Sequence, residues 1–418
     1  MFKLLKSIDR KRILFFLGVI GPGIITANVD NDAGGIATYS VAGAHYGYSL
    51  LWSLIPMLAA LFMIQEMAAR LGVVTGKGLS DLIRERFGVR ITVLTMLALL
   101  ITNFGNIAAE FAGVAASLEI FGVSRYISVP LGAVFVWYLV VRGNYRIVEK
   151  VFLFACTVYL AYVASGFMAD PPWGEVLVAL VKPTFHLDTE YIFMFMGLIG
   201  TTIAPWMQFY QQASTVEKAI HVRDYRYVWW DTAVGCLFAV AVVFFIMVAC
   251  AATLHANGVR VKSAEDAAVA LAPFAGRYAS VLFAVGLANA SLFAASILPL
   301  STAYSVCEGL GWEAGVNKEF EDAPQFFGIY TGLIALGAAL ILIPGAPLIG
   351  IMLVSQVVNG ILLPFVLIFI LLLVNDGELM GTHVNGRVYN GLCWILAAIL
   401  IVLSLALLWS SISDLYGG

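Results

Sequence analysis

The sequence predicts an all-α, polytopic membrane protein. Of its 418 residues, 61% are hydrophobic and only 12% are charged, whereas about a quarter are charged in soluble proteins. The mean hydropathy is +0.93, and apolar runs of about 20 residues, long enough to cross a bilayer, recur along the chain. The formal net charge of −3 and the five scattered cysteines predict neither nucleic-acid binding nor disulfides. The expected surroundings are therefore a lipid bilayer.

Eleven membrane spans are predicted from the apolar runs. Their approximate bounds are 14–42, 48–70, 92–119, 126–142, 149–168, 190–215, 229–253, 278–306, 326–344, 347–374 and 388–411. The first span is too long and too polar for a signal peptide. The loops between spans are short, so we expect a single transporter domain covering residues 1–418.

The distribution of positive charge predicts the orientation. With the N-terminus in the cytoplasm, inner segments hold 18 of the 23 Lys and Arg residues and outer segments hold five. Cytoplasmic loops are rich in Lys and Arg, so this bias places the N-terminus inside and the C-terminus outside. We expect a plasma-membrane protein that is monomeric.

The first span contains a polar run, NVDNDAGG (28–35), that does not suit a helix in lipid. A carboxylate at the bilayer centre costs at least about 2.5–3.5 kcal/mol, and each glycine costs a helix about 1 kcal/mol. Unpaired backbone groups are tolerated in a membrane only where they face protein or water. We therefore predict that Gly34 and Gly35 break the helix beside Asp32.

The sixth span has a second predicted break, at Pro205. Proline has no N–H, so the carbonyl of Thr201 loses its helical partner. Breaks in the first and sixth spans are typical of transporters built from five-helix inverted repeats. We predict repeats at about 14–168 and 190–374, with an extra helix at 388–411. Each break alone also fits close helix packing or a simple kink.

Three long segments resemble the NRAMP family of divalent-metal transporters. These are DAGGIAT with AGAHYGYSLLW in span 1, residues 65–88, and residues 355–381. The resemblance implies that Asp32 is a metal ligand, that Gln356 assists it, and that Glu110 lies on a proton route. It also places Gly34 on the family's glycine and Pro205 on the proline of a Met-Pro-His motif.

Departures from the family pattern affect the expected selectivity. The family's proline, metal-binding asparagine, methionine and histidine are Ala33, Gly35, Ala204 and Trp206 here, and an expected acidic residue is Ile107. These losses look like those of the NRAMP-related magnesium transporters. They leave oxygen donors, which suit Mg²⁺ and Mn²⁺ better than softer metals, in a roomy site that fits a partly hydrated ion. The expected site residues are Asp32, Thr201, Ala204, Gln356, Gly35 and Asn31.

Further polar residues are expected along the ion pathway or its vestibule. Asp30 and Asp32 do not share a helical face, so Asp30 is expected to point into a vestibule. Gln208 lies one turn past the second break, and Asn359 shares a helical face with Gln356. The remaining candidates are Glu110, Glu66 and Trp206, although buried carboxyl groups are also common as hydrogen-bonded structural elements.

We expect Mg²⁺ uptake, with Mn²⁺ also accepted, without proton coupling. None of the five histidines lies in the middle of a predicted span, and histidine is the side chain that titrates near neutral pH. Entry of a divalent cation gains about 4.6 kcal/mol per 100 mV, inside negative. The transported ion is cargo, and no resident cofactor is expected.

Three alternatives remain. The chain can be a proton-coupled Mn²⁺/Fe²⁺ importer of the NRAMP type that lacks the methionine. It can be a sodium-coupled amino-acid or amine symporter, although spans 2 and 10 argue against this. An intramembrane enzyme is disfavoured because no HExxH, phosphate-loop or catalytic-triad pattern falls within a span.

Overall fold

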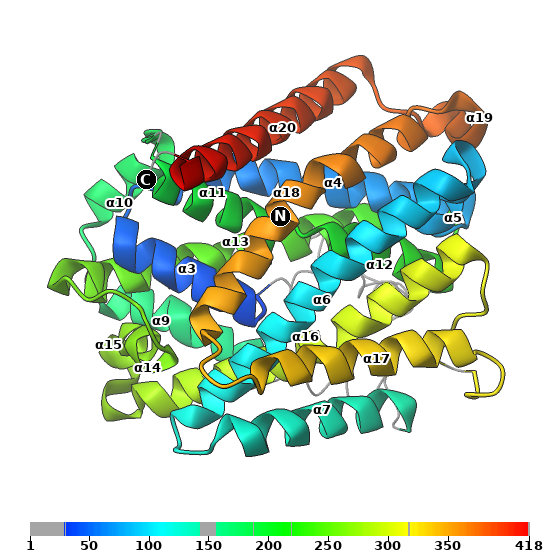
Figure 1. Cartoon of the computed structure of the whole chain (residues 1–418). Helices are drawn as coiled ribbons and strands as arrows, with labels where there is room; N and C mark the ends of the chain where they lie inside the picture. The colour runs from blue at the N-terminus through cyan, green and yellow to red at the C-terminus, as the bar shows by residue number, and fades with distance from the viewer. Residues whose placement is uncertain are drawn as a thin grey trace, which may run out of the picture.

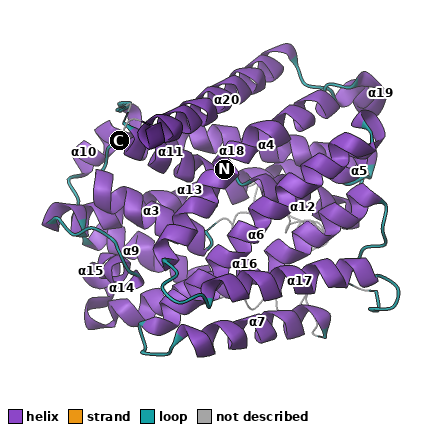
Figure 2. Cartoon of the chain, viewed as in Figure 1, coloured by secondary structure: helices purple, strands orange, loops and turns teal. Residues whose placement is uncertain are grey.

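The computed structural model shows an all-helical membrane protein (Figure 1). It describes Val29 and residues 31–142, 156–186, 188–218, 220–316 and 318–416, which form helices joined by short loops, without a strand in these ranges (Figure 2). Eight helical segments of the described chain are long and apolar enough to cross a membrane. The predicted fold class is therefore confirmed.

The α-helices agree with the predicted spans to within one or two turns, where the predicted span is described. Residues 14–28 of the first span and 149–155 of the fifth lie outside the described residues. The helices are α3 (Ala33–Tyr46), α4 (Leu54–Thr75), α5 (Leu79–Phe87), α6 (Val89–Glu119), α7 (Arg125–Val141), α9 (Leu160–Met168), α10 (Trp173–Val181), α11 (Thr189–Thr202), α12 (Pro205–Glu217), α13 (Tyr225–Thr253), α14 (Ala264–Ala268), α15 (Ala272–Ala275), α16 (Ala279–Leu310), α17 (Pro324–Ile341), α18 (Leu348–Val374), α19 (Gly377–Met380) and α20 (Arg387–Tyr416).

The long helices pack in two groups with α18 between them. In the first group, α3 packs against α13, and α4 packs against α12 and α13. In the second, α6 lies along α16 and α17, and α17 contacts α7. Helix α18 contacts α6, α3 and α11. Four helices, α3, α6, α11 and α18, therefore meet in the region where the polar runs of the sequence are buried.

The outermost helices carry an apolar surface. Figure 1 shows α20 and α7 at opposite edges of the molecule. Large apolar side chains are exposed on both, among them Leu131 and Val134 on α7 and Val402 and Leu405 on α20. Soluble monomers rarely expose apolar patches of this extent. These faces are suited to contact with lipid.

Contacts between the two halves of the chain occur in matched pairs. The first span of the first half packs on the second span of the other half, as α3 on α13, and the reverse pair is α4 on α12. This pairing is what two repeats related by a two-fold axis would produce. The repeat bounds of 14–168 and 190–374 stay a prediction.

Candidate metal site

Asp32 lies at the N-terminus of α3, where the chain is not helical. Its Oδ1 atom accepts a hydrogen bond from the backbone N–H of Gly35 at 2.6 Å, and the residue is only 5% exposed. A carboxylate is stabilised there by the free N–H groups and the positive end of the helix dipole. The position suits a buried carboxylate that binds a cation. Asp30 lies outside the described residues.

The prediction that Gly34 and Gly35 themselves break the helix is wrong. Both lie in the first turn of α3, and the non-helical residues are Asn31 and Asp32. The Asp32 cap explains part of the difference, because an N-cap contributes about 1 kcal/mol and offsets the helix cost of one of the two glycines. The break is therefore set by the aspartate, and the glycines serve another purpose.

The second break separates α11 from α12 at Ile203 and Ala204. Ala204 has an extended backbone (φ −69°, ψ 139°), and Pro205 is the first residue of α12. Proline suits this position because its missing N–H would have no helical partner. Pro205 also cannot donate to the Thr201 carbonyl four residues earlier. The predicted break at Pro205 is confirmed.

Gln356 on α18 lies between these two breaks. A Cβ atom placed on Gly34 would be 1.9 Å from Gln356 Nε2, and one on Gly200 would be 1.9 Å from the Gln356 backbone oxygen. Gly200 therefore allows the backbones of α11 and α18 to approach, and Gly34 leaves room for the Gln356 side chain in its present position. A further contact joins α3 to α11, because Tyr39 Oη lies 3.3 Å from Thr202 Oγ1. The structure thus brings Asp32, Gln356 and the α11 end together.

Glu110 on α6 completes this group. Its Oε2 atom accepts a hydrogen bond from the Ala33 N–H at 3.3 Å, and the residue is fully buried. Its carboxyl group interacts electrostatically with that of Asp32. The Oε1 atom has no hydrogen-bond partner within the described part of the chain. Two carboxyl groups therefore share the N-terminus of α3.

Two residues of this site were missed in the sequence. Tyr159 Oη donates to the Asn31 carbonyl at 2.6 Å, which ties the first break to the fifth span. Asn106 lies one turn before Glu110 on α6 and bonds to Asn359 on α18. The spacing of four between Asn106 and Glu110 is a signal that the sequence carries. No comparable pattern marks Tyr159, which lies in an apolar run.

Several of the other expected residues are buried around the second break. Gln208 Nε2 donates to the Ala204 carbonyl at 3.2 Å, so this side chain covers the break. Trp206 is 1% exposed, and its ring lies 6.1 Å from that of Tyr210. Ala204 is also buried, and so is Asn31 at the first break. Their roles at the ion or along its pathway stay a prediction.

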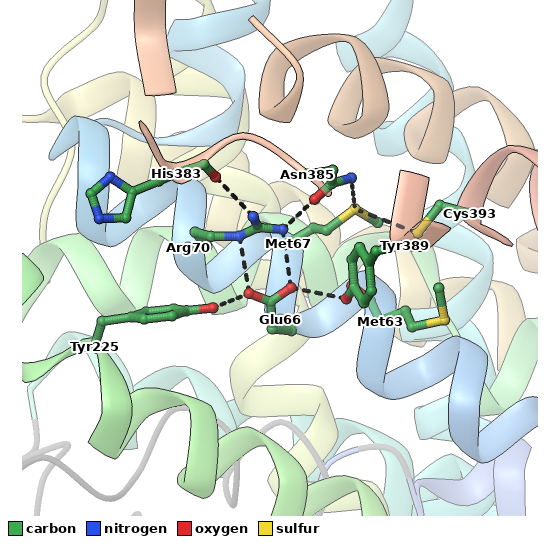
Figure 3. A network of polar contacts seen from close by, with 9 residues as sticks. All are labelled: Met63, Glu66, Met67, Arg70, Tyr225, His383, Asn385, Tyr389 and Cys393. Carbon is green, nitrogen blue, oxygen red and sulfur yellow. Dashed lines mark hydrogen bonds and ion pairs between the residues drawn. The ribbon is translucent and has the colours of Figure 1, made fainter. Parts of the chain in front are cut away.

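Glu66 belongs to a different network, shown in Figure 3. It pairs with Arg70, with 3.0 Å between Glu66 Oε1 and Arg70 Nε, and it accepts hydrogen bonds from Tyr225 and Tyr389. Arg70 also bonds to the 383–385 segment that precedes α20. The predicted pathway role of Glu66 gains no support, because its carboxylate is occupied by this network. The network instead joins α4, α13 and α20.

The donors at the site are carboxylate, amide and backbone oxygens. In the described ranges, no three His, Cys, Asp or Glu residues are grouped closely enough to hold a metal ion. A cation at Asp32 would therefore depend on amide and carbonyl oxygens and on water as well. Such donors suit a hard divalent ion that is bound and released.

Comparison with known proteins identifies the family. Residues 23–410 match the family described as natural resistance-associated macrophage protein-like (Nramp). The chain belongs to the Nramp family. It is 31% identical to the divalent metal cation transporter MntH of Ralstonia nicotianae, over 96% of this chain and 91% of that protein. It is 25% identical to MntH of Bacillus subtilis, covering 94% and 92% of the two chains.

A solved transporter structure shows the same fold. The manganese transporter of Eremococcus coleocola, in complex with an aromatic bis-isothiourea compound, matches with a TM-score of 0.79 at 22% identity. The match covers 98% of this chain and 90% of that one. These relatives support a divalent metal cation transporter. They do not support the magnesium branch that the departures in the sequence led us to expect.

Proposed function

We propose that this Nramp protein imports Mn²⁺, with Fe²⁺ as a related cargo, by a proton-coupled mechanism. The observation that carries the proposal is the placement of the Asp32 carboxylate at the α3 N-terminus, against Gln356 and the end of α11. Support for Mn²⁺ comes from the relatives, which include a manganese transporter and divalent metal cation transporters. The same cargo is the first alternative that the sequence leaves open.

Mg²⁺ is the second candidate cargo, and one observation favours it. Ala204 occupies the second break, so this position provides no sulfur ligand. Thioether sulfur favours softer metals, whereas carboxylates, carbonyls and water suit Mg²⁺ and Mn²⁺ alike. Selectivity against Mg²⁺ would then depend on how much hydration the site allows.

Glu110 supports coupling to protons. No coupling is expected from the sequence, because no histidine lies in the middle of a predicted span and because Trp206 and Ile107 replace the family's histidine and acidic residue. Glu110 is buried, however, and its carboxyl group adjoins both Asp32 and the first residue of α3. A carboxyl group beside the cation ligand can hold a proton in the absence of the ion and release it when the ion binds. For import to be proton-coupled, the displaced proton must leave toward the cytoplasm, so that Mn²⁺ and H⁺ both move inward.

We further propose a monomer in the plasma membrane, with the N-terminus in the cytoplasm and the C-terminus outside. The charge bias of the loops supports this orientation. The apolar faces of α7 and α20 support contact with lipid on both edges of a single chain.

The test is uptake of Mn²⁺ and of Mg²⁺ into proteoliposomes by the wild type and by Asp32→Ala. Asp188→Ala is the matched control, because Asp188 caps α11 in the same way, accepting from the Tyr191 N–H at 2.9 Å. We expect Asp32→Ala to abolish Mn²⁺ uptake and Asp188→Ala to retain it. Uptake of Mg²⁺ but not Mn²⁺ would establish the second candidate. Mn²⁺ or Mg²⁺ uptake that is unchanged in Asp32→Ala would contradict the assignment of Asp32 as a ligand of the transported ion.

A further inference from the structure

Three buried amide side chains form a chain of hydrogen bonds that ends at the candidate metal site. Asn106 Nδ2 donates to Asn359 Oδ1 at 2.9 Å, and Asn359 Nδ2 donates back to Asn106 Oδ1 at 3.0 Å. Asn359 Nδ2 also donates to Gln356 Oε1 at 2.9 Å. All three residues are at most 1% exposed. The three amides therefore satisfy one another away from bulk solvent.

One polar atom of these three amides has no hydrogen-bond partner in the described part of the protein. An amide nitrogen has two hydrogens to donate, and Asn359 uses both, one to Asn106 and one to Gln356. The Gln356 oxygen is occupied by Asn359. The Gln356 nitrogen has no partner in the described part of the chain and lies against Gly34 at the start of α3. The Gln356 atom that faces the site is therefore the amide nitrogen, a hydrogen-bond donor that cannot bind a cation.

A cation can use Gln356 only if its carbonyl oxygen faces the site. Turning the Gln356 amide alone would place its nitrogen against the Asn359 nitrogen, so that two donors would meet. Asn359 would have to turn as well, and its oxygen would then face the Asn106 oxygen. Only when Asn106 also turns does every amide regain a complementary partner. The chain therefore has two self-consistent states, which differ in the end of Gln356 that faces the site.

We propose that Asn106 and Asn359 are positioning residues that set which end of the Gln356 amide faces the transported cation. This inference rests on the proposed function, because it concerns how Gln356 is oriented within the same site. In one state the Gln356 nitrogen faces α3, and in the other its oxygen faces the ion. The hydrogen bonds of Asn106 lead to the ion through Asn359 and Gln356, so an effect on KM that travels along them must disappear when Gln356 is removed.

The experiment is a double-mutant cycle on Mn²⁺ uptake, with KM and Vmax measured separately in proteoliposomes. Loss of an outer partner of a metal ligand typically costs 10- to 100-fold in affinity. We expect Asn106→Leu to raise KM about tenfold with little change in Vmax. In a Gln356→Ala background, we expect the same substitution to leave KM unchanged. An equal rise of KM in both backgrounds, or none in either, would overturn the inference.

Asn103→Leu is the matched control. Asn103 lies one turn before Asn106 on α6, is fully buried, and donates to Thr302 Oγ1 at 2.8 Å. It has no connection to Gln356, so we expect lower stability with an unchanged KM. A rise of KM equal to that of Asn106→Leu would show that loss of any buried asparagine on α6 produces the effect, and would overturn the inference.

Asn359→Asp is a second variant in case Asn106→Leu does not fold. Aspartate accepts at both oxygens, so it holds the Gln356 nitrogen and turns the Gln356 oxygen to the site, at the cost of one oxygen–oxygen contact with Asn106 Oδ1. We expect a lower KM, and a smaller decrease in the Gln356→Ala background, where only the added charge acts. Equal decreases would overturn the inference. A wild type that moves no divalent cation would instead refute the proposed function itself.

Discussion

Glu110 Oε2 accepts a hydrogen bond from the backbone N–H of Ala33 at 3.3 Å. This contact joins α6 to the first residue of α3, one position after the candidate ligand Asp32. The N–H groups at the start of a helix have no partner within the helix, so a carboxyl group from another helix satisfies one of them. A carboxyl group on α6 therefore contacts the start of α3 directly beside the candidate ligand.

Substitution of Glu110 by glutamine tests whether this carboxyl group carries a proton. The glutamine oxygen can still accept from the Ala33 N–H, but the side chain no longer titrates. We expect Mn²⁺ uptake to continue while proton entry, read from a pH-sensitive dye inside the liposomes, falls to background. The control is Glu119→Gln, at the end of the same helix in a pair with Arg125. Unchanged proton entry in Glu110→Gln would contradict the assignment.

Gly34→Ala is expected to weaken Mn²⁺ binding while leaving the fold intact. The new Cβ atom would lie 1.9 Å from Gln356 Nε2, the end of a flexible side chain that can move away. Because Gln356 is a candidate ligand, we expect KM to rise about tenfold, as for loss of a supporting partner. Gly105→Ala is the control, since its Cβ meets only Ser355 Cβ, at 3.9 Å. An equal KM in Gly34→Ala and wild type would contradict the role of Gln356.

Gly200→Ala is expected to act on stability instead. Its Cβ would lie 1.9 Å from the Gln356 backbone oxygen and 2.4 Å from the Gly360 nitrogen, and backbone atoms cannot rotate aside. Overpacking of this kind costs about 1–3 kcal/mol or more. We expect a clear decrease in the melting temperature in detergent. Gly328→Ala on α17, where no atom lies within 4 Å, should not lower it.

The ion pair between Glu66 and Arg70 provides a test of the network that joins α4, α13 and α20. Their side chains are 7% and 11% exposed, so Arg70→Met leaves a buried carboxylate without its counter-ion. Breaking such a pair costs about 3–5 kcal/mol, whereas an exposed pair is worth about 0–1 kcal/mol. We expect Arg70→Met to lower the unfolding free energy far more than Lys77→Met, which breaks an exposed pair with Glu85. Adding Glu66→Gln to Arg70→Met should restore part of the loss.

The second break was predictable because its cause is local. Proline lacks an N–H wherever it occurs, so Pro205 ends the hydrogen bonding of α11 whatever surrounds it. The first break was placed correctly in its span but on the wrong residues. Glycine has only a weak preference against helix, and the Asp32 cap together with the close approach of Gln356 outweighs it. The cap could have been inferred from an aspartate three residues before Gly35, a common N-terminal pattern.

Glu66 and Asn106 show why the remaining assignments required the structure. Both are polar residues in apolar helices, and their own helices give no sign of the partners they meet on other helices. Glu66 has Arg70 four residues later, a spacing visible in the sequence, but Tyr225 and Tyr389 lie far along the chain. Asn106 meets Asn359 across 253 residues. Glu66 belongs to the network that joins α4, α13 and α20, whereas Asn106 lies beside the candidate metal site.

The sequence by itself determined the membrane class, the approximate spans, the break at Pro205 and the candidate ligand Asp32. Each of these follows from local chemistry: apolar length, a missing N–H, or a charge that lipid does not tolerate. Only the tertiary structure decided that Gln356 lies between the two breaks, that Glu110 contacts α3, and that Asn106 reaches Gln356. Those relationships depend on how helices from distant parts of the chain pack against one another, in part at glycines. Such contacts leave no periodic signal in any one segment of the sequence.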